Sequence, residues 1–75
     1  MYFNEYDEAI RCFDQAIAIN VNYAKAYDLK GKCLVELKDY DAAIESFSKA
    51  IKIDPLNKVF KEDREITIKH RGNFR

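Results

Sequence analysis

The side chains that could carry chemistry are scattered, and none of them has the spacing of a catalytic or metal site. His70 is the sole histidine, and no nucleophile or orienting carboxylate is spaced to serve it. Cys12 and Cys33 lie 21 positions apart without a second pair, which fits neither a zinc site nor a disulfide framework. The chain also lacks a glycine-rich phosphate loop. We therefore expect no enzyme activity, no cofactor and no metal, and we interpret both cysteines as small buried apolar residues.

The composition indicates one small folded domain without a charge excess. The 75 residues are 48% hydrophobic and 35% charged, with one proline and two glycines, which is typical of a helix-rich chain. Thirteen basic residues balance thirteen acidic ones, so the basic excess of a nucleic-acid binder is absent. No apolar run approaches the roughly 20 residues of a membrane span, and the acidic start of the chain is unlike a signal peptide. We expect a cytoplasmic protein with no nucleic-acid or membrane partner.

An internal repeat with a period of 34 organises the sequence. Eight of the sixteen residues from Glu5 to Asn20 are identical to the residue 34 positions later. The pairs are Tyr6 and Tyr40, Asp7 and Asp41, Ala9 and Ala43, Ile10 and Ile44, Phe13 and Phe47, Ala16 and Ala50, Ile17 and Ile51, and Ile19 and Ile53. The matched residues are mostly apolar and the mismatches mostly polar, so the repeat preserves a packing face. We therefore assign the repeated aromatic residues to helix packing rather than to base stacking.

The periodicity predicts one helix in each copy and another between them. In each copy the apolar residues fall at i, i+1, i+4, i+7 and i+8, which draws one stripe along a helix. Asp39 or Asp41 can cap the helix of the second copy, and Pro55 ends it. Between the copies, residues 24–37 form an amphipathic helix that contains Gly31. Because a mid-helix glycine costs about 1 kcal/mol against alanine, we expect a neighbouring helix too close for a side chain there.

These spacings resemble the tetratricopeptide repeat, a pair of antiparallel helices in 34 residues. The resemblance covers 24–57 as one complete repeat and rests on Tyr27, Gly31, Leu34, Tyr40, Ala43, Phe47, Ala50 and Pro55. It implies an all-α stack of antiparallel helix pairs, a TPR-like alpha solenoid of about four helices, and no catalytic activity. One departure is Lys30, which stands where the family commonly has an apolar residue, and we expect its aliphatic stem to lie along the core.

The resemblance also divides the chain. Residues 1–71 form a single helical unit, made of a half repeat (1–22), the full repeat (24–57) and a terminal capping helix (58–70), and a disordered tail (72–75) follows. The terminal segment has an alternative interpretation. Residues 65–69 alternate in polarity as a strand does, so this segment is either a polar helix that shields the last hydrophobic face or a degenerate tail.

The family uses a concave groove, lined by the first helix of each pair, for peptides and partner proteins. On the complete first helix, the exposed face that the resemblance assigns to this groove is Lys25, Asp28, Leu29, Lys32, Val35 and Glu36. The next helix continues it with Val59, Glu62, Asp63 and Ile66. The resemblance thus implies a protein-interaction module that binds a protein or peptide partner, and the alternative is a solvated helix face in mixed charge.

One ligand class of the family is disfavoured by the residue types in this groove. Members that clamp the C-terminal carboxylate of chaperones use lysine, arginine and asparagine as donors. Acidic and apolar residues stand at the corresponding places here, namely Asp28, Leu29, Val59 and Asp63. They argue against a carboxylate clamp.

A rival function follows from the first half repeat. The resemblance places residues 1–3 at the end of a first helix that is missing, so the helix after it is expected to have one uncovered apolar flank. That flank consists of Phe3, Tyr6, Ile10 and Phe13. It predicts a structural element that self-associates into a homo-oligomer or stacks on another repeat of a longer array.

Overall fold

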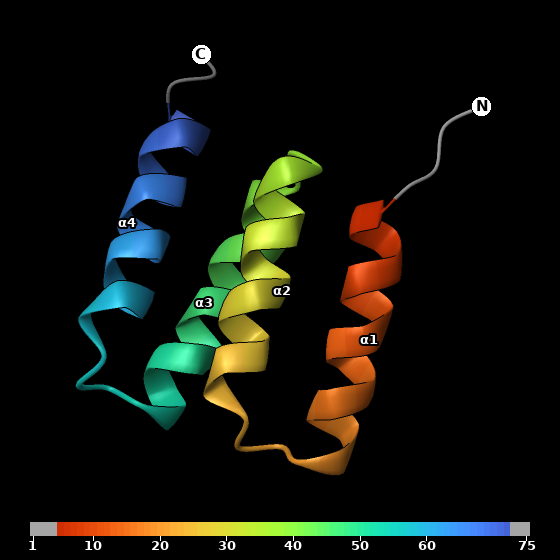
Figure 1. Cartoon of the computed structure of the whole chain (residues 1–75). Coiled ribbons are helices and arrows are strands. Elements are labelled where there is room, and N and C mark those ends of the chain that lie inside the picture. The colour runs from red at the N-terminus through yellow and green to blue at the C-terminus, as the bar shows by residue number, and fades with distance from the viewer. Residues whose placement is uncertain (1–4, 73–75) are drawn as a thin grey trace.

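The chain folds into helices that follow one another in antiparallel order (Figure 1). The computed structural model describes residues 5–72. Within them lie α1 (Glu5–Ile19), α2 (Ala24–Glu36), α3 (Tyr40–Ile53) and α4 (Lys58–Gly72), and no strand. The all-α helix-turn-helix stack expected from the sequence is confirmed.

The helices form a flat stack in which α2 is central. It packs on both α1 and α3, and it also reaches α4, which packs mainly on α3 (Figure 1). By contrast, α1 contacts α2 alone among the described helices, and none of its residues is buried. Of the flank that was expected to be uncovered on this helix, Tyr6 is 42% exposed and Ile10 and Phe13 are half-buried, while Phe3 lies outside the described residues.

The hydrophobic core lies where α2, α3 and α4 meet. It consists of Ala26, Ala43, Phe47, Ala50 and Phe60, which are almost fully buried. Gly31 of α2 faces α3 at this point, and a Cβ built on it would lie 2.5 Å from Cε1 of Phe47. The close approach predicted from this glycine is confirmed, with the phenyl ring as the neighbour.

The ends of the helices follow from local chemistry. Asp39, rather than Asp41, caps α3, because its Oδ1 accepts a hydrogen bond of 3.4 Å from the Ala42 N–H. The helix ends at Ile53, immediately before the extended residue that precedes Pro55. At the start of α4, Oδ1 of Asn57 accepts from the Val59 N–H at 2.9 Å and from the Phe60 N–H at 3.4 Å.

The turn between α2 and α3 contains a residue in the left-handed backbone conformation that is not glycine. Lys38 has φ 66°, and its N–H donates to the Val35 carbonyl at 2.9 Å. The next N–H, of Asp39, donates to the Leu34 carbonyl at 2.9 Å. This pair of backward hydrogen bonds is a Schellman motif, in which glycine is usually the left-handed residue.

The last segment is a helix, so the strand-like alternative is wrong. Phe60 and Thr67, seven residues apart, are the buried positions of α4, whereas Ile66 and Ile68 are largely exposed. The residues of α4 that face α3 therefore follow the spacing of a helix. They do not follow the alternation of polar and apolar residues at 65–69. Gly72 was expected in the tail but is the last residue of α4. Residues 73–75 of that tail lie outside the described residues.

Ion pairs between helices involve polar residues that lie outside the hydrophobic core. Lys30 Nζ lies 2.7 Å from Asp14 Oδ1, so the departure from an apolar residue at this position becomes an ion pair between α2 and α1. Arg71 Nη1 lies 2.7 Å from Asp41 Oδ1 and joins α4 to α3.

The burial expected for the cysteines is wrong for Cys12, which is exposed because α1 packs on one neighbour only, while Cys33 is half-buried.

Candidate binding groove

The residues assigned to the groove all lie on α2 but differ in exposure. Lys25, Lys32 and Glu36 are exposed, and Leu29 and Val35 are half-buried. Asp28 was expected on the exposed face, yet its side chain is 0% exposed. Asp28 is buried because α4 packs near α2 and covers this face of the helix.

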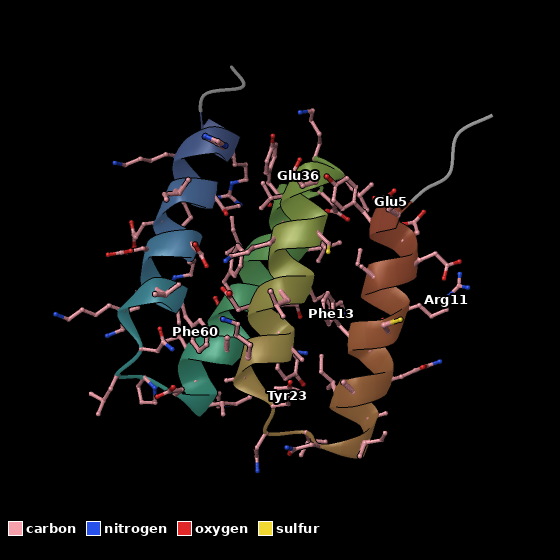
Figure 2. The ribbon with its side chains drawn as sticks, in the orientation of Figure 1. Glu5, Arg11, Phe13, Tyr23, Glu36 and Phe60 are labelled. Carbon is pink, nitrogen blue, oxygen red and sulfur yellow. The ribbon has the colours of Figure 1, made fainter. Side chains whose placement is uncertain are left out.

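Two hollows flank the exposed residues of α2. The first, which we call the α1–α2 hollow, has a volume of about 390 Å³ and is lined by Glu5, Tyr6, Ala9, Phe13, Leu29, Lys32, Cys33 and Glu36. Figure 2 shows Phe13 of α1 between that helix and α2. The hollow therefore joins residues predicted for the groove with Tyr6 and Phe13 from the predicted self-association flank. Ile10 does not line it, and Phe3 lies outside the described residues.

The second hollow, which we call the α2–α4 hollow, has a volume of about 200 Å³. It is lined by Lys32, Val35, Glu36, Phe47, Asp63, Ile66 and Thr67. Lys32 and Glu36 therefore belong to both hollows, and together the two hollows form the candidate groove. Of the residues predicted to continue the groove on α4, Asp63 and Ile66 line it, whereas Val59 and Glu62 are exposed residues outside its lining.

A pair of carboxyl groups lies beside Lys32: Asp63 lines the α2–α4 hollow, and the buried Asp28 contacts the same lysine. The Lys32 Nζ atom is 3.6 Å from Asp28 Oδ2 and 3.8 Å from Asp63 Oδ2. Both oxygens of Asp28 and Oδ2 of Asp63 are buried and have no hydrogen-bond partner among the described residues. Buried polar atoms are almost always paired, so these three oxygens are an unusual feature of the fold.

The carboxyl of Asp28 titrates far from its ordinary range. Burial, above all, raises the pKa of Asp28 from 3.8 to about 7. The hydrogen bond that Asp28 makes with Asp63 when it is protonated, and the negative charge of Asp63, raise this pKa further, whereas the charges of Lys32 and Lys25 oppose the rise. Two ionised carboxylates can only accept, so the pair can bond to itself only while one of them holds a proton.

The sequence carried one local signal for this cluster, the spacing of Asp28 and Lys32 by four residues, which places them on one helix face. The juxtaposition with Asp63, 35 positions later, follows from the way α4 returns beside α2. Sequence reasoning assigned both carboxylates to one groove but treated them as solvent-exposed.

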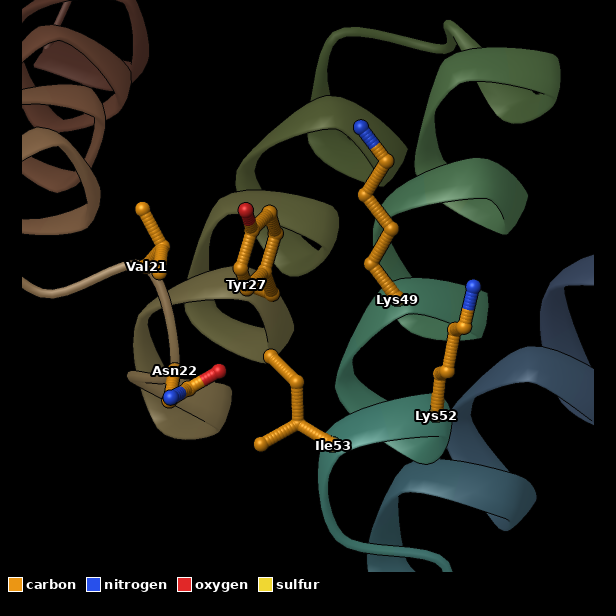
Figure 3. Close-up of a pocket in the computed structure, with 6 residues that line it drawn as sticks. All are labelled: Val21, Asn22, Tyr27, Lys49, Lys52 and Ile53. Carbon is orange, nitrogen blue, oxygen red and sulfur yellow. The ribbon is translucent and has the colours of Figure 1, made fainter.

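A further hollow escaped the sequence analysis. It has a volume of about 770 Å³ and is lined by Val21, Asn22, Tyr27, Lys49, Lys52 and Ile53 (Figure 3). The Lys49 Nζ atom lies 5.9 Å from the centre of the Tyr27 ring, within the range of a cation–π contact. Both lysines are exposed, so the hollow is an open cationic surface rather than an enclosed site.

The structure also defines the surroundings of the Cys33 thiol and the His70 ring. Burial raises the pKa of the Cys33 thiol, and the charge of Glu36 adds to the rise, so this thiol is a poor nucleophile at neutral pH. The exposed His70 ring packs edge-on against Tyr40, with ring centres 6.4 Å apart.

Across residues 5–72 no group of three or more His, Cys, Asp or Glu side chains could hold a metal ion. Over the same range, no helix has the length and apolar character to cross a membrane.

Comparison with known proteins identifies the repeat. The family model described as Tetratricopeptide repeat matches residues 24–55, which are α2, α3 and the turns beside them. The chain is a tetratricopeptide repeat protein. The presence of a tetratricopeptide repeat suggests a role in protein–protein interaction.

Curated relatives carry the same repeat within much longer chains. A DnaJ homolog subfamily C member 7 homolog of Dictyostelium discoideum is 30% identical over 76 residues, which covers 100% of this chain and 14% of the relative. A small glutamine-rich tetratricopeptide repeat-containing protein 2 of Mycosarcoma maydis is 34% identical over 58 residues, covering 77% of this chain and 16% of the relative. A TPR repeat-containing protein of Methanocaldococcus jannaschii is 40% identical over 55 residues, which cover 73% of this chain and 10% of the relative. None of these relatives is named as an enzyme.

Proposed function

We propose that this tetratricopeptide repeat protein binds a peptide segment of a partner protein in the groove formed by the two hollows beside α2. The observation that carries the proposal is that Lys32 and Glu36 line both the α1–α2 hollow and the α2–α4 hollow, so the two hollows adjoin along α2. Recognition grooves combine apolar pockets with a few charged groups that orient the ligand. Leu29 and Val35 supply apolar surface in the two hollows, and the shared charged residues lie between them.

The groove is tested by charge substitutions in each hollow. Leu29→Asp and Val35→Asp place a carboxylate against the apolar part of the ligand, and Leu56→Asp is the matched control, because Leu56 is 89% exposed and lines neither hollow. The ligand is selected with the wild-type chain from a displayed library of random peptides. Its contact surface is then mapped by the amide shifts of the ¹⁵N-labelled protein.

We expect both groove variants to weaken peptide binding at least about tenfold, which corresponds to about 1.4 kcal/mol, and the control to bind as the wild type does. Circular dichroism checks that each variant keeps its helical content. Selected peptides that shift amides elsewhere, or that bind all three variants equally, would show that the groove is not the binding site.

A second candidate function is assembly through α1, and the repeat itself favours it. Tyr6, Ala9 and Phe13 correspond to Tyr40, Ala43 and Phe47, so α1 and α3 share a packing face. In α3 that face is covered by α2, and its alanine and phenylalanine are buried. In α1 the equivalent residues line an open hollow. We infer that a helix of another repeat or of a second copy can pack there as α2 packs on α3.

A further inference from the structure

The ammonium group of Lys32 is poorly placed for the carboxylates beside it. It lies 3.6 and 3.8 Å from the facing oxygens of Asp28 and Asp63, beyond the roughly 2.7–2.9 Å of a charge-assisted hydrogen bond. The pair of Lys30 with Asp14, by comparison, is 2.7 Å long. Lys32 therefore offsets charge at this site without satisfying the hydrogen-bonding capacity of the carboxylates.

The unsatisfied capacity belongs to buried atoms. The side chain of Asp28 is 0% exposed, and while both carboxyls are ionised its two oxygens and Oδ2 of Asp63 have no hydrogen-bond partner in the described part of the chain. Leaving buried acceptors unpaired is unfavourable, and bonds from a charged donor are the strongest remedy. A group with several N–H donors, brought from outside, could pair with more than one of these oxygens.

The site is reachable from the groove. Asp63 is 20% exposed on its side chain and lines the α2–α4 hollow, and Lys32, whose ammonium lies 3.6 Å from the buried Asp28, is half exposed and lines the same hollow. The volume of about 200 Å³ lies below the roughly 300 Å³ of small-molecule pockets, so it suits one side chain. Val35, Phe47 and Ile66 provide apolar walls for the stem of a long side chain.

The charge of the site selects the sign of the ligand. When Asp28, Asp63 and Glu36 are all ionised, their three negative charges exceed the two positive charges of Lys32 and Lys25 by one, and protonation of Asp28 removes this excess. An anionic ligand entering the hollow meets Asp63 and Glu36 on its lining and is repelled. A cation instead relieves the repulsion between the carboxylates of Asp28 and Asp63.

We propose that the α2–α4 hollow binds a cationic side chain of the partner peptide, arginine or lysine, which replaces the Lys32 ammonium between Asp28 and Asp63. This inference rests on the proposed groove function and adds the chemistry of the ligand. The partner segment is therefore basic at the position that enters the hollow. Its stem lies against Val35 and Ile66, and its charged end reaches the carboxyl pair.

The first test uses small probes on the full chain. Acetyl-arginine amide and acetyl-lysine amide are titrated into the ¹⁵N-labelled protein, with acetyl-citrulline amide as the neutral isostere of arginine, at matched ionic strength. We expect both cations to shift the amides of Asp63, Ile66 and Thr67, with citrulline at least about tenfold weaker. Citrulline binding as well as arginine, or shifts confined to other surfaces, would overturn the inference.

The second test uses matched carboxylate variants. Asp63→Asn removes one charge from the pair, and Asp41→Asn removes an exposed carboxylate at another ion pair. We expect the first to weaken arginine binding about tenfold and the second to leave it unchanged, while Lys32→Gln strengthens it by removing the resident competitor. Equal binding by the Asp63 and Asp41 variants would contradict the proposal.

Peptide selection separates this inference from the function on which it rests. Groove-binding peptides enriched in arginine or lysine, and weakened by Asp63→Asn, support both. Peptides that map to the two hollows but show no basic preference and bind Asp63→Asn normally overturn the cation site and leave the groove intact. Selected peptides that map elsewhere overturn the groove itself.

Discussion

The ring of Phe47 occupies the space that a side chain on Gly31 would need. A Cβ at that position would lie 2.5 to 2.8 Å from three atoms of the ring, closer than carbon atoms approach in folded proteins. Phe47 is 1% exposed, so the ring is enclosed by its neighbours and has little room to shift. The pair therefore sets how closely α2 and α3 approach.

The first prediction is that Gly31→Ala destabilises the protein despite the better helix propensity of alanine. Overpacking typically costs about 1–3 kcal/mol, which exceeds the gain of about 1 kcal/mol from replacing a mid-helix glycine. Urea unfolding followed by circular dichroism measures the difference. Gly72→Ala is the control, because apart from its chain neighbours and its own helix backbone no atom of the described residues lies within 4 Å of a Cβ built there. Equal stability of the wild type and Gly31→Ala would mean that the ring yields freely.

The second prediction concerns the pH dependence of stability that Asp28 produces. Its pKa is about 7 in the folded protein and 3.8 as the ordinary value, so the folded state holds this proton more tightly. The stabilisation is complete below pH 3.8 and is lost as the pH rises toward 7. The free energy of unfolding therefore falls by up to about 1.4 kcal/mol per pH unit in this interval from this group alone.

Asp28→Asn tests that assignment, because an amide does not titrate and can donate a hydrogen bond to Asp63. Relative to the wild type, this variant gains stability steadily as the pH rises from 4 to 7 in a series of urea titrations. Asp41→Asn, at an exposed carboxylate, controls for the loss of one charge and gives no such trend. A difference between Asp28→Asn and the wild type that does not change with pH would refute the buried titration.

The third prediction is that Lys38→Gly stabilises the protein. Lys38 holds φ 66°, a region that disfavours residues with a Cβ by about 1–2 kcal/mol and that glycine enters freely. The greater freedom of glycine in the unfolded chain offsets part of this gain, so we expect a net increase of about 0.5–1 kcal/mol. Thermal unfolding measures it. Lys38→Ala keeps the Cβ and should show no gain, so equal stabilisation by alanine would refute the strain.

The elements that the sequence specified are those encoded by local chemistry and by the repeat. Ala43, Phe47 and Ala50 are buried because the helical spacing places them on one face, and the repeat identified that face. Asp39 caps α3 through a side-chain oxygen, and Pro55 follows its end. The helix face and the helix end could be predicted from spacing and from proline, whereas the sequence left the cap open between Asp39 and Asp41, and the structure shows that Asp39 is the cap.

The features that the sequence did not specify depend on contacts between distant helices. Asp28 appeared to belong to the exposed face, since α2 alone would leave it there. Its burial and its contact with Asp63 exist only because α4 returns beside α2. Similarly, Tyr6 and Leu29 were assigned to separate surfaces, but the packing of α1 on α2 joins them in one hollow.

The fourth prediction is that the protein self-associates through α1 as its concentration rises. Tyr6 is 42% exposed, Phe13 and Ala9 line an open hollow, and no residue of α1 is buried, so association would remove apolar surface from water. We expect light scattering after size exclusion to show a mass that grows with concentration over about a hundredfold range. Tyr6→Glu should restore the monomer, because it places a charge in the interface, whereas Tyr23→Glu, at a similarly exposed tyrosine outside the α1–α2 hollow, should not. A monomer at every concentration would remove the assembly function and leave the groove as the working surface. Association that both tyrosine variants retain would place the interface on another face of the stack.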